Sequence, residues 1–208
     1  MNNLIELDEY LDLSKLGLVN QEFIDTVDEV SSKYADIFTA NLVKEHDLTY
    51  SEGVDILYLR DSLPDFYEDY CYEQIDKFIF WKDYPVYDYF PQLRELISLL
   101  PFESIGRIFV VYSKDKINTH THFDHAHDCH NEFIWLRLNK NKKMFIVKDG
   151  KKFFHEGYSC WFDSRKFHGA EALGKDGVSV RVDGKFTSDF REKVFGKDAE
   201  WESLPLEK

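Results

Sequence analysis

Residues 132–164 read EFIWLRLNKNKKMFIVKDGKKFFHEGYSCWFDS and contain four short apolar runs separated by turn residues. The runs are EFIWLRL (132–138), KMFIVK (143–148), KKFFHE (151–156) and SCWFDS (159–164). Their β-branched and aromatic content is typical of strands. Asp149-Gly150 predicts a tight hairpin between the second and third runs, because this pair tolerates the positive φ angles of a type I′ turn.

Similar runs lie on both sides of this stretch. IGRIFVVYS (105–113) precedes it and VSVRVDGKF (178–186) follows it, and an amphipathic helix is expected over 188–195. Six or more short strands in about 80 residues indicate a sandwich or barrel.

The first 100 residues have a different pattern. Apolar side chains at steps of three and four predict a helix over 21–46, and prolines open two further helices expected over 65–81 and 91–100. We therefore expect a mainly helical part at 1–100 and a β core at 101–208, packed as one compact α+β unit.

The charged residues are distributed unevenly between these two parts of the chain. The 208 residues carry a formal charge of −13, and residues 1–100 hold 22 acidic and 7 basic side chains against 17 and 19 in the rest. Such acidity argues against a nucleic-acid or anionic-membrane binder, since either polyanion would be repelled.

Three widely spaced cysteines do not form a closed disulfide set, which favours a reducing compartment. The sequence starts without a basic segment leading into a long apolar run, and it has no apolar stretch of 18 residues. A cytoplasmic protein is the expectation.

A histidine cluster, THTHFDHAHDCH (119–130), lies directly before the quoted stretch and holds five of the eight histidines. Imidazole nitrogens mixed with carboxylates suit iron, manganese or zinc. In an extended chain residues i and i+2 point to the same side, so His122 and Asp124 can reach one ion. His168 is the best distal third ligand, because it follows a turn and enters a strand; His155 is the other candidate.

Two imidazoles and one carboxylate leave three positions of an octahedral ion open, as a non-haem Fe(II) oxygenase requires. A keto acid bound there would also need a cation for its far carboxylate. Arg181 follows His168 by 13 residues and could form a forked pair with that group. Ser179 and Asp183 would share its face of the strand, with three valines on the other.

These residues carry a resemblance. The stretch from about 105 to 186, with His122-x-Asp124, the run 159–164, His168 and Arg181, resembles the double-stranded β-helix core of the 2-oxoglutarate- and Fe(II)-dependent oxygenases, near the aspartyl/prolyl hydroxylase-like branch. The resemblance implies a jelly-roll core and Fe(II) held by the three ligands. It also implies a hydroxylase that consumes 2-oxoglutarate and O2, with Arg181 on the distal carboxylate.

Three more residues are candidates to line that cosubstrate site. Trp135 and Arg137 share one face of their strand and offer stacking and carboxylate recognition. Tyr112, at the end of an earlier strand, offers a hydroxyl.

Some alternatives stay open. His120-x-His122 is a competing register that resembles cupins, and His125 could supplement the ligands. A metal-binding β-helix module without catalysis is the rival function. The substrate and the oligomeric state are undetermined.

Overall fold

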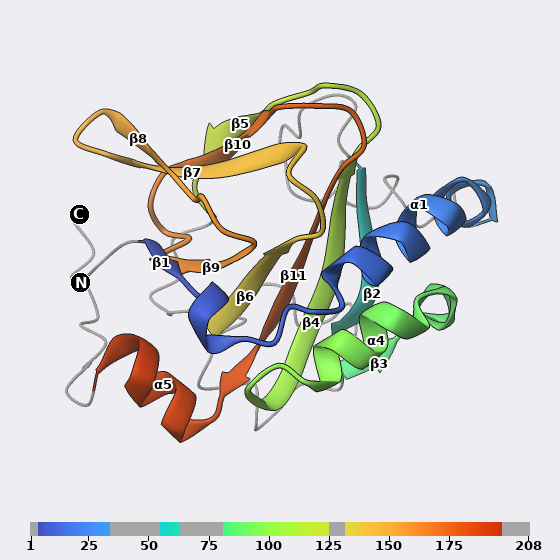
Figure 1. Ribbon diagram of the computed structural model, residues 1–208, viewed down its shortest axis with the longest axis horizontal. Coiled ribbons are helices and arrows are strands. Elements are labelled where there is room, and N and C mark those ends of the chain that lie inside the picture. The colour runs from blue at the N-terminus through green and yellow to red at the C-terminus, as the bar shows by residue number, and fades with distance from the viewer. Residues whose placement is uncertain (1–3, 34–54, 63–80, 125–131, 197–208) are drawn as a thin grey trace.

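The structure is a computed structural model that describes residues 4–33, 55–62, 81–124 and 132–196. These residues form two antiparallel sheets and three α-helices (Figure 1). The larger sheet contains, in spatial order, β1 (Leu4–Glu6), β9 (Ser159–Phe162), β6 (Glu132–Arg137), β11 (Gly177–Phe186), β4 (Phe102–Ser113), β2 (Asp55–Ser62) and β3 (Trp81–Asp83). The smaller sheet contains β5 (Thr119–His122), β10 (His168–Ala172), β7 (Lys142–Lys148) and β8 (Lys151–Phe154). The expected double-stranded β-helix core is confirmed.

All six strands expected in the second half are present. The β7–β8 hairpin turns at Asp149 and Gly150, whose φ angles of 51° and 72° are those a type I′ turn requires. Two strands, β5 and β10, were not predicted as runs, because THTH contains no apolar residue and HGAEA consists largely of Gly, Ala and Glu, which are depleted in strands. His168 is the first residue of β10, as its position after a turn predicted.

A mainly helical first half is not what the described residues show. The helix expected over 21–46 is α1 (Leu16–Lys33) as far as the description extends, and α4 (Pro91–Ser98) is the helix expected over 91–100. The helix expected over 65–81 lies outside the described residues, except that Trp81 begins β3 instead. Since β1, β2 and β3 join the larger sheet, strands from both halves of the chain build one layer.

Helices α1 and α4 cover one face of the larger sheet (Figure 1). Apolar side chains of both helices and of the sheet form one buried cluster there, including Phe23, Leu93, Leu57, Val110 and Val180. The Glu22 carboxylate of α1 accepts the first backbone N–H groups of α4, where a negative charge suits the helix dipole. The other face of the larger sheet is turned toward the smaller sheet.

The connection from β10 to β11 is not a hairpin, because β10 pairs with β5 and β7 whereas β11 pairs with β4 and β6. The segment therefore crosses from one sheet to the other, with Asp176 at φ 53°. The chain ends its described part with α5 (Ser188–Phe195), as expected.

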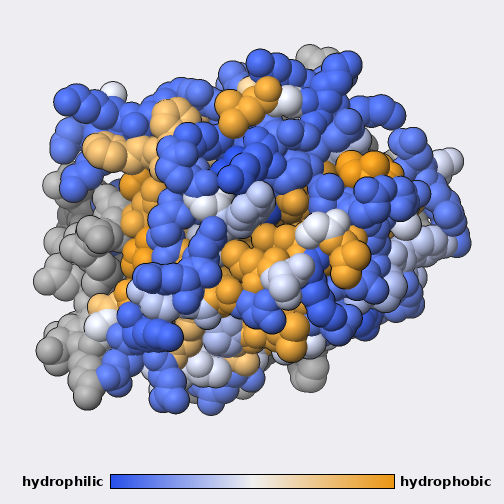
Figure 2. All heavy atoms as spheres, viewed as in Figure 1, coloured by the Kyte–Doolittle hydropathy of each residue, from blue (hydrophilic) through white to orange (hydrophobic). Residues whose placement is uncertain are grey.

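The surface of the face seen in Figure 1 is hydrophilic around its edge, and apolar side chains gather toward the middle (Figure 2). None of the helices in the described ranges is long and apolar enough to cross a membrane.

Candidate metal centre

Three side chains converge where β5 and β10 lie side by side. His122 ends β5, Asp124 follows two residues later, and His168 begins β10 directly opposite His122. One nitrogen or oxygen atom from each lies within 4.8 Å of the others, and this is the group that the described residues offer to a metal ion. The structure thus brings together the three residues that the spacing predicted.

Backbone carbonyl groups orient both imidazole rings. Nδ1 of His122 lies 2.8 Å from the carbonyl oxygen of His120, and Nδ1 of His168 lies 2.8 Å from that of Lys166. A carbonyl oxygen only accepts hydrogen bonds, so each Nδ1 carries the hydrogen and each Nε2 keeps its lone pair. Such outer contacts are what hold histidine ligands of metals in one tautomer.

The free lone pairs are directed at one carboxylate oxygen. Asp124 Oδ1 lies 3.9 Å from Nε2 of His122 and 3.6 Å from Nε2 of His168. The donor set therefore fits an iron-type divalent cation in both atom type and orientation.

The charges of the site also suit a cation. Burial alone would raise the pKa of Asp124, but the Arg181 guanidinium and the neighbouring histidines lower it to about 2. Burial lowers the pKa of His168 to about 4, against the opposing pull of Asp124. At neutral pH the carboxyl is ionised and His168 is neutral, which are the protonation states that metal binding requires.

Arg181 lies beside the triad, but protein carboxylates hold it. Its Nη1 donates to Asp124 Oδ2 at 2.8 Å and its Nε to Asp183 Oδ1 at 2.7 Å. The other oxygen of Asp183 accepts from Arg107 at 3.0 Å, and the Phe133 ring stacks 4.0 Å from the Arg181 guanidinium. Arg181 and Asp183 are neighbours on β11, as their shared face predicted, and the guanidinium is paired with carboxylates of the protein.

Trp135 lies next to Arg181 in the paired strands β6 and β11. Its ring is 6.2 Å from Phe162, whose own ring is 4.8 Å from His168. Phe162 is a neighbour of the triad that the sequence did not single out. The aromatic pattern of β9 marks it as buried but gives no sign of which sheet it faces.

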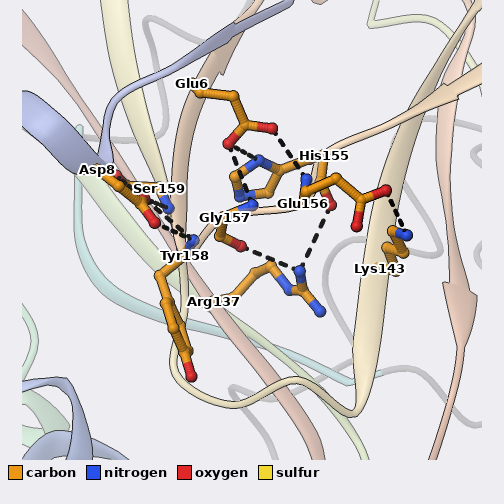
Figure 3. Close-up of polar contacts among 9 residues, drawn as sticks. All are labelled: Glu6, Asp8, Arg137, Lys143, His155, Glu156, Gly157, Tyr158 and Ser159. Carbon is orange, nitrogen blue, oxygen red and sulfur yellow. Dashed lines mark hydrogen bonds and ion pairs between the residues drawn. The ribbon is translucent and has the colours of Figure 1, made fainter.

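Arg137 and His155 meet away from the triad, at the connection between β8 and β9 (Figure 3). Nη1 of Arg137 donates to the carbonyl oxygen of Gly157 at 3.0 Å. His155 is fully buried, with Nδ1 2.6 Å from a carboxylate oxygen of Glu6. His155 is therefore not one of the side chains that converge with His122 and Asp124 in the described part of the chain.

Tyr112 corrects another expectation. It pairs with Val178, which alternates with Arg181 along β11, so its side chain points to the helix-covered face. There its ring packs 5.3 Å from Phe23 of α1, and its hydroxyl donates to Asp176. A tyrosine on this face does not reach the triad.

The alternative register through His120 is not the one that converges among the described residues, since the converging side chains are those of His122, Asp124 and His168. His125 and the rest of the histidine cluster lie outside the described residues.

No protein-family model and no curated protein sequence matches the chain. In fold it is similar to a prolyl hydroxylase from Trichoplax adhaerens, solved in complex with a peptide fragment of the hypoxia inducible factor oxygen degradation domain. That match has a TM-score of 0.53 and 10% identity, and covers 93% of this chain and 87% of that one. A prolyl-4-hydroxylase from Pseudomonas putida matches with a TM-score of 0.48 and 12% identity, over 90% and 94% of the two chains. An oxidoreductase of the 2OG-Fe(II) oxygenase family from Burkholderia pseudomallei matches with a TM-score of 0.40 and 10% identity, over 83% and 91%. The chain thus has the fold of the Trichoplax hydroxylase and a His-x-Asp…His triad at the meeting of two of its strands.

Proposed function

We propose that the protein is an Fe(II)- and 2-oxoglutarate-dependent oxygenase that hydroxylates a small molecule or a protein residue. The observation that carries the proposal is the convergence of His122, Asp124 and His168 from two strands of a double-stranded β-helix. Two imidazoles and one carboxylate occupy one side of an octahedral ion and leave the other side for a keto acid and O2.

Asp124 divides its two oxygens between two tasks. Oδ2 accepts from Arg181, whereas Oδ1 points at the two Nε2 atoms. Arg181 therefore holds the carboxylate in one orientation and keeps it ionised, and the carbonyls behind the two histidines fix the orientation of the neutral rings. This chain contributes a preorganised set of three ligands.

The bound metal would supply the redox chemistry, in which a substrate C–H, 2-oxoglutarate and O2 become an alcohol, succinate and CO2. The protein supports that chemistry by orienting the ligands and by excluding water. Phe162 packs beside the distal histidine on the side of the larger sheet, and Trp135 packs against Phe162.

Spectroscopy on the anaerobic protein tests the proposal. Fe(II) followed by 2-oxoglutarate should produce the weak visible charge-transfer absorption of a metal-bound keto acid. His122→Ala should abolish the absorption, and His120→Ala, which keeps the backbone carbonyl behind His122, should retain it. On admission of O2, succinate should be released in amounts that depend on the metal.

A different result would favour the rival function. If the protein bound metal tightly but gave neither the absorption nor succinate with any pool of amino acids, peptides or nucleotides, it would be a metal-binding module without catalysis. If succinate is released, the same pools identify the substrate class.

A further inference from the structure

Lys142 is a buried cation with no carboxylate partner among the described residues. It lies on β7 and is 5% exposed, and its Nζ donates to the hydroxyl of Ser113 on β4 at 2.8 Å. Burial lowers its pKa to about 8. A buried ammonium group costs several kcal/mol unless an anion pairs with it, so this position is suited to receive a negative charge from outside the chain.

Lys142 faces the same inter-sheet space as the metal ligands. In the paired strands β10 and β7, His168 lies opposite Ile146 and Ala172 lies opposite Lys142. Residues that pair, and residues two apart in a strand, share one face. Lys142 is therefore on the face of His168, about 13 Å further along the sheet. Ala170 of β10 and Met144 of β7, which pair with each other, stand between the two levels.

The larger sheet offers hydroxyl groups at the level of Lys142. Ser113 pairs with Gly177 of β11, and a Cβ atom added to Gly177 would lie 3.1 Å from Cβ of Lys142. Ser179 is the next residue of β11 on that face. Ser179 is 2% exposed, and its buried hydroxyl has no hydrogen-bond partner in the described part of the chain. Buried hydroxyls are rarely left unpaired, so the Ser179 hydroxyl is suited to bind a polar group of a ligand.

Arg181 is less available for the same anion. Asp124 and Asp183 already accept from its guanidinium, and Asp183 is fully buried. The charge of this guanidinium is thus already paired within the protein, whereas the Lys142 ammonium has no carboxylate partner among the described residues.

We propose that Lys142, together with the hydroxyls of Ser113 and Ser179, binds the distal carboxylate of the keto-acid cosubstrate, while Arg181 positions Asp124. This assignment rests on the proposed function. It replaces the sequence-based expectation that Arg181 receives the distal carboxylate.

Two keto acids distinguish binding at the proposed carboxylate receptor, formed by Lys142, Ser113 and Ser179, from binding at the metal site. 2-Oxoglutarate has a distal carboxylate, whereas 2-oxobutyrate has the same chelating end without it. With the anaerobic Fe(II) protein, titration followed by visible absorption should give tighter binding of 2-oxoglutarate. Lys142→Met should weaken 2-oxoglutarate binding on the order of 100-fold, the effect of removing one partner of a buried charge pair, and leave 2-oxobutyrate binding unchanged.

Matched variants complete the experiment. Lys143→Met changes the next residue, whose Nζ pairs with the exposed Glu156 carboxylate, and should bind both keto acids like the wild type. Ser179→Ala keeps Lys142 and should weaken only 2-oxoglutarate binding, on the order of 10-fold. It serves as the second test if Lys142→Met does not fold.

The two proposals fail in different ways. If the wild-type metal protein gave no absorption with either keto acid, the proposed function would be wrong, and the receptor with it. If Lys142→Met and Ser179→Ala kept the full preference for 2-oxoglutarate, only the receptor would be wrong. Loss of that preference in Arg181→Lys alone would return the role to Arg181.

Discussion

Two clusters in this protein contain the same residue types, a buried histidine, a carboxylate and an arginine. One is the triad cluster, with His168, Asp124 and Arg181. The other, which we call the N-terminal clamp, comprises Glu6, Asp8, Arg137 and residues 155–159 (Figure 3). Composition alone does not distinguish them, so the difference must lie in where the lone pairs point.

In the clamp, backbone N–H groups donate hydrogen bonds to the carboxylate oxygens. Glu6 accepts from the N–H groups of Glu156 and Gly157 at 2.9 and 3.2 Å and also contacts His155. In the triad cluster, Oδ1 of Asp124 instead points at two imidazole nitrogens that bear lone pairs. A histidine–carboxylate pair becomes a candidate metal site when its lone pairs converge and no N–H group occupies them.

The clamp has a structural task. Asp8 accepts from the backbone N–H groups of Tyr158 and Ser159 at 2.6–3.0 Å, and the Ser159 hydroxyl donates to it as well. A Cβ atom at Gly157 would lie 2.6 Å from a carboxylate oxygen of Asp8, so the approach requires glycine. The clamp thereby ties β1 and the segment after it to the β8–β9 connection.

Metal affinity should separate the two clusters most strongly. Asp124→Asn removes the charged ligand, and we expect the affinity for Mn(II) to fall at least about 100-fold, more than for loss of an outer contact. Glu6→Gln should leave that affinity unchanged. Isothermal titration of both variants measures the difference, and equal losses would break the comparison.

The free energy of unfolding should depend more on the N-terminal clamp than metal affinity does. Asp8→Ala leaves two backbone N–H groups of the clamp without an acceptor, and we expect the free energy of unfolding to fall by about 2–3 kcal/mol. Urea denaturation measures it, with the exposed neighbour Glu9→Ala as control, expected within about 0.5 kcal/mol of the wild type. A loss of Mn(II) affinity in Asp8→Ala would show that the clusters are coupled.

The clamp should also respond to acid. Burial lowers the pKa of His155 below its usual 6.5, against the opposing effect of Glu6. Below about pH 6.5 the unfolded chain takes up a proton that the folded protein does not, so stability falls as the pH falls. His155→Gln should reduce this slope in urea titrations of the metal-free protein between pH 7.5 and 5. A slope identical to that of the wild type would exclude His155 as a contributor.

The smallest effect is expected at the edge of the clamp. Lys143 pairs with Glu156 at 2.6 Å, but the Glu156 side chain is 73% exposed. Solvent screens such pairs, so Lys143→Met should change the unfolding free energy by no more than about 0.5 kcal/mol, and less in 1 M salt. A larger loss in differential scanning calorimetry would mean that the clamp depends on this ion pair.

The strands of the core could be predicted because alternating apolar residues and the Asp149-Gly150 turn are local signals. The short strands β1 and β3 could not, since three residues carry no periodicity and pair only because a neighbouring strand is already in place. The direction of Tyr112 was missed for a related reason. Residues 110–113 at the end of β4 are all buried, so their pattern does not say which face meets the helices and which meets the smaller sheet.

The sequence by itself determined six strands of the β core and the closeness of His122 to Asp124, because strand propensity and i, i+2 spacing act over a few residues. Only the tertiary structure decided which cations are paired. Whether Arg181 finds a carboxylate and Lys142 finds none depends on strands that are distant in sequence. Charge pairing acts across the space between two sheets, and the register of those sheets determines it.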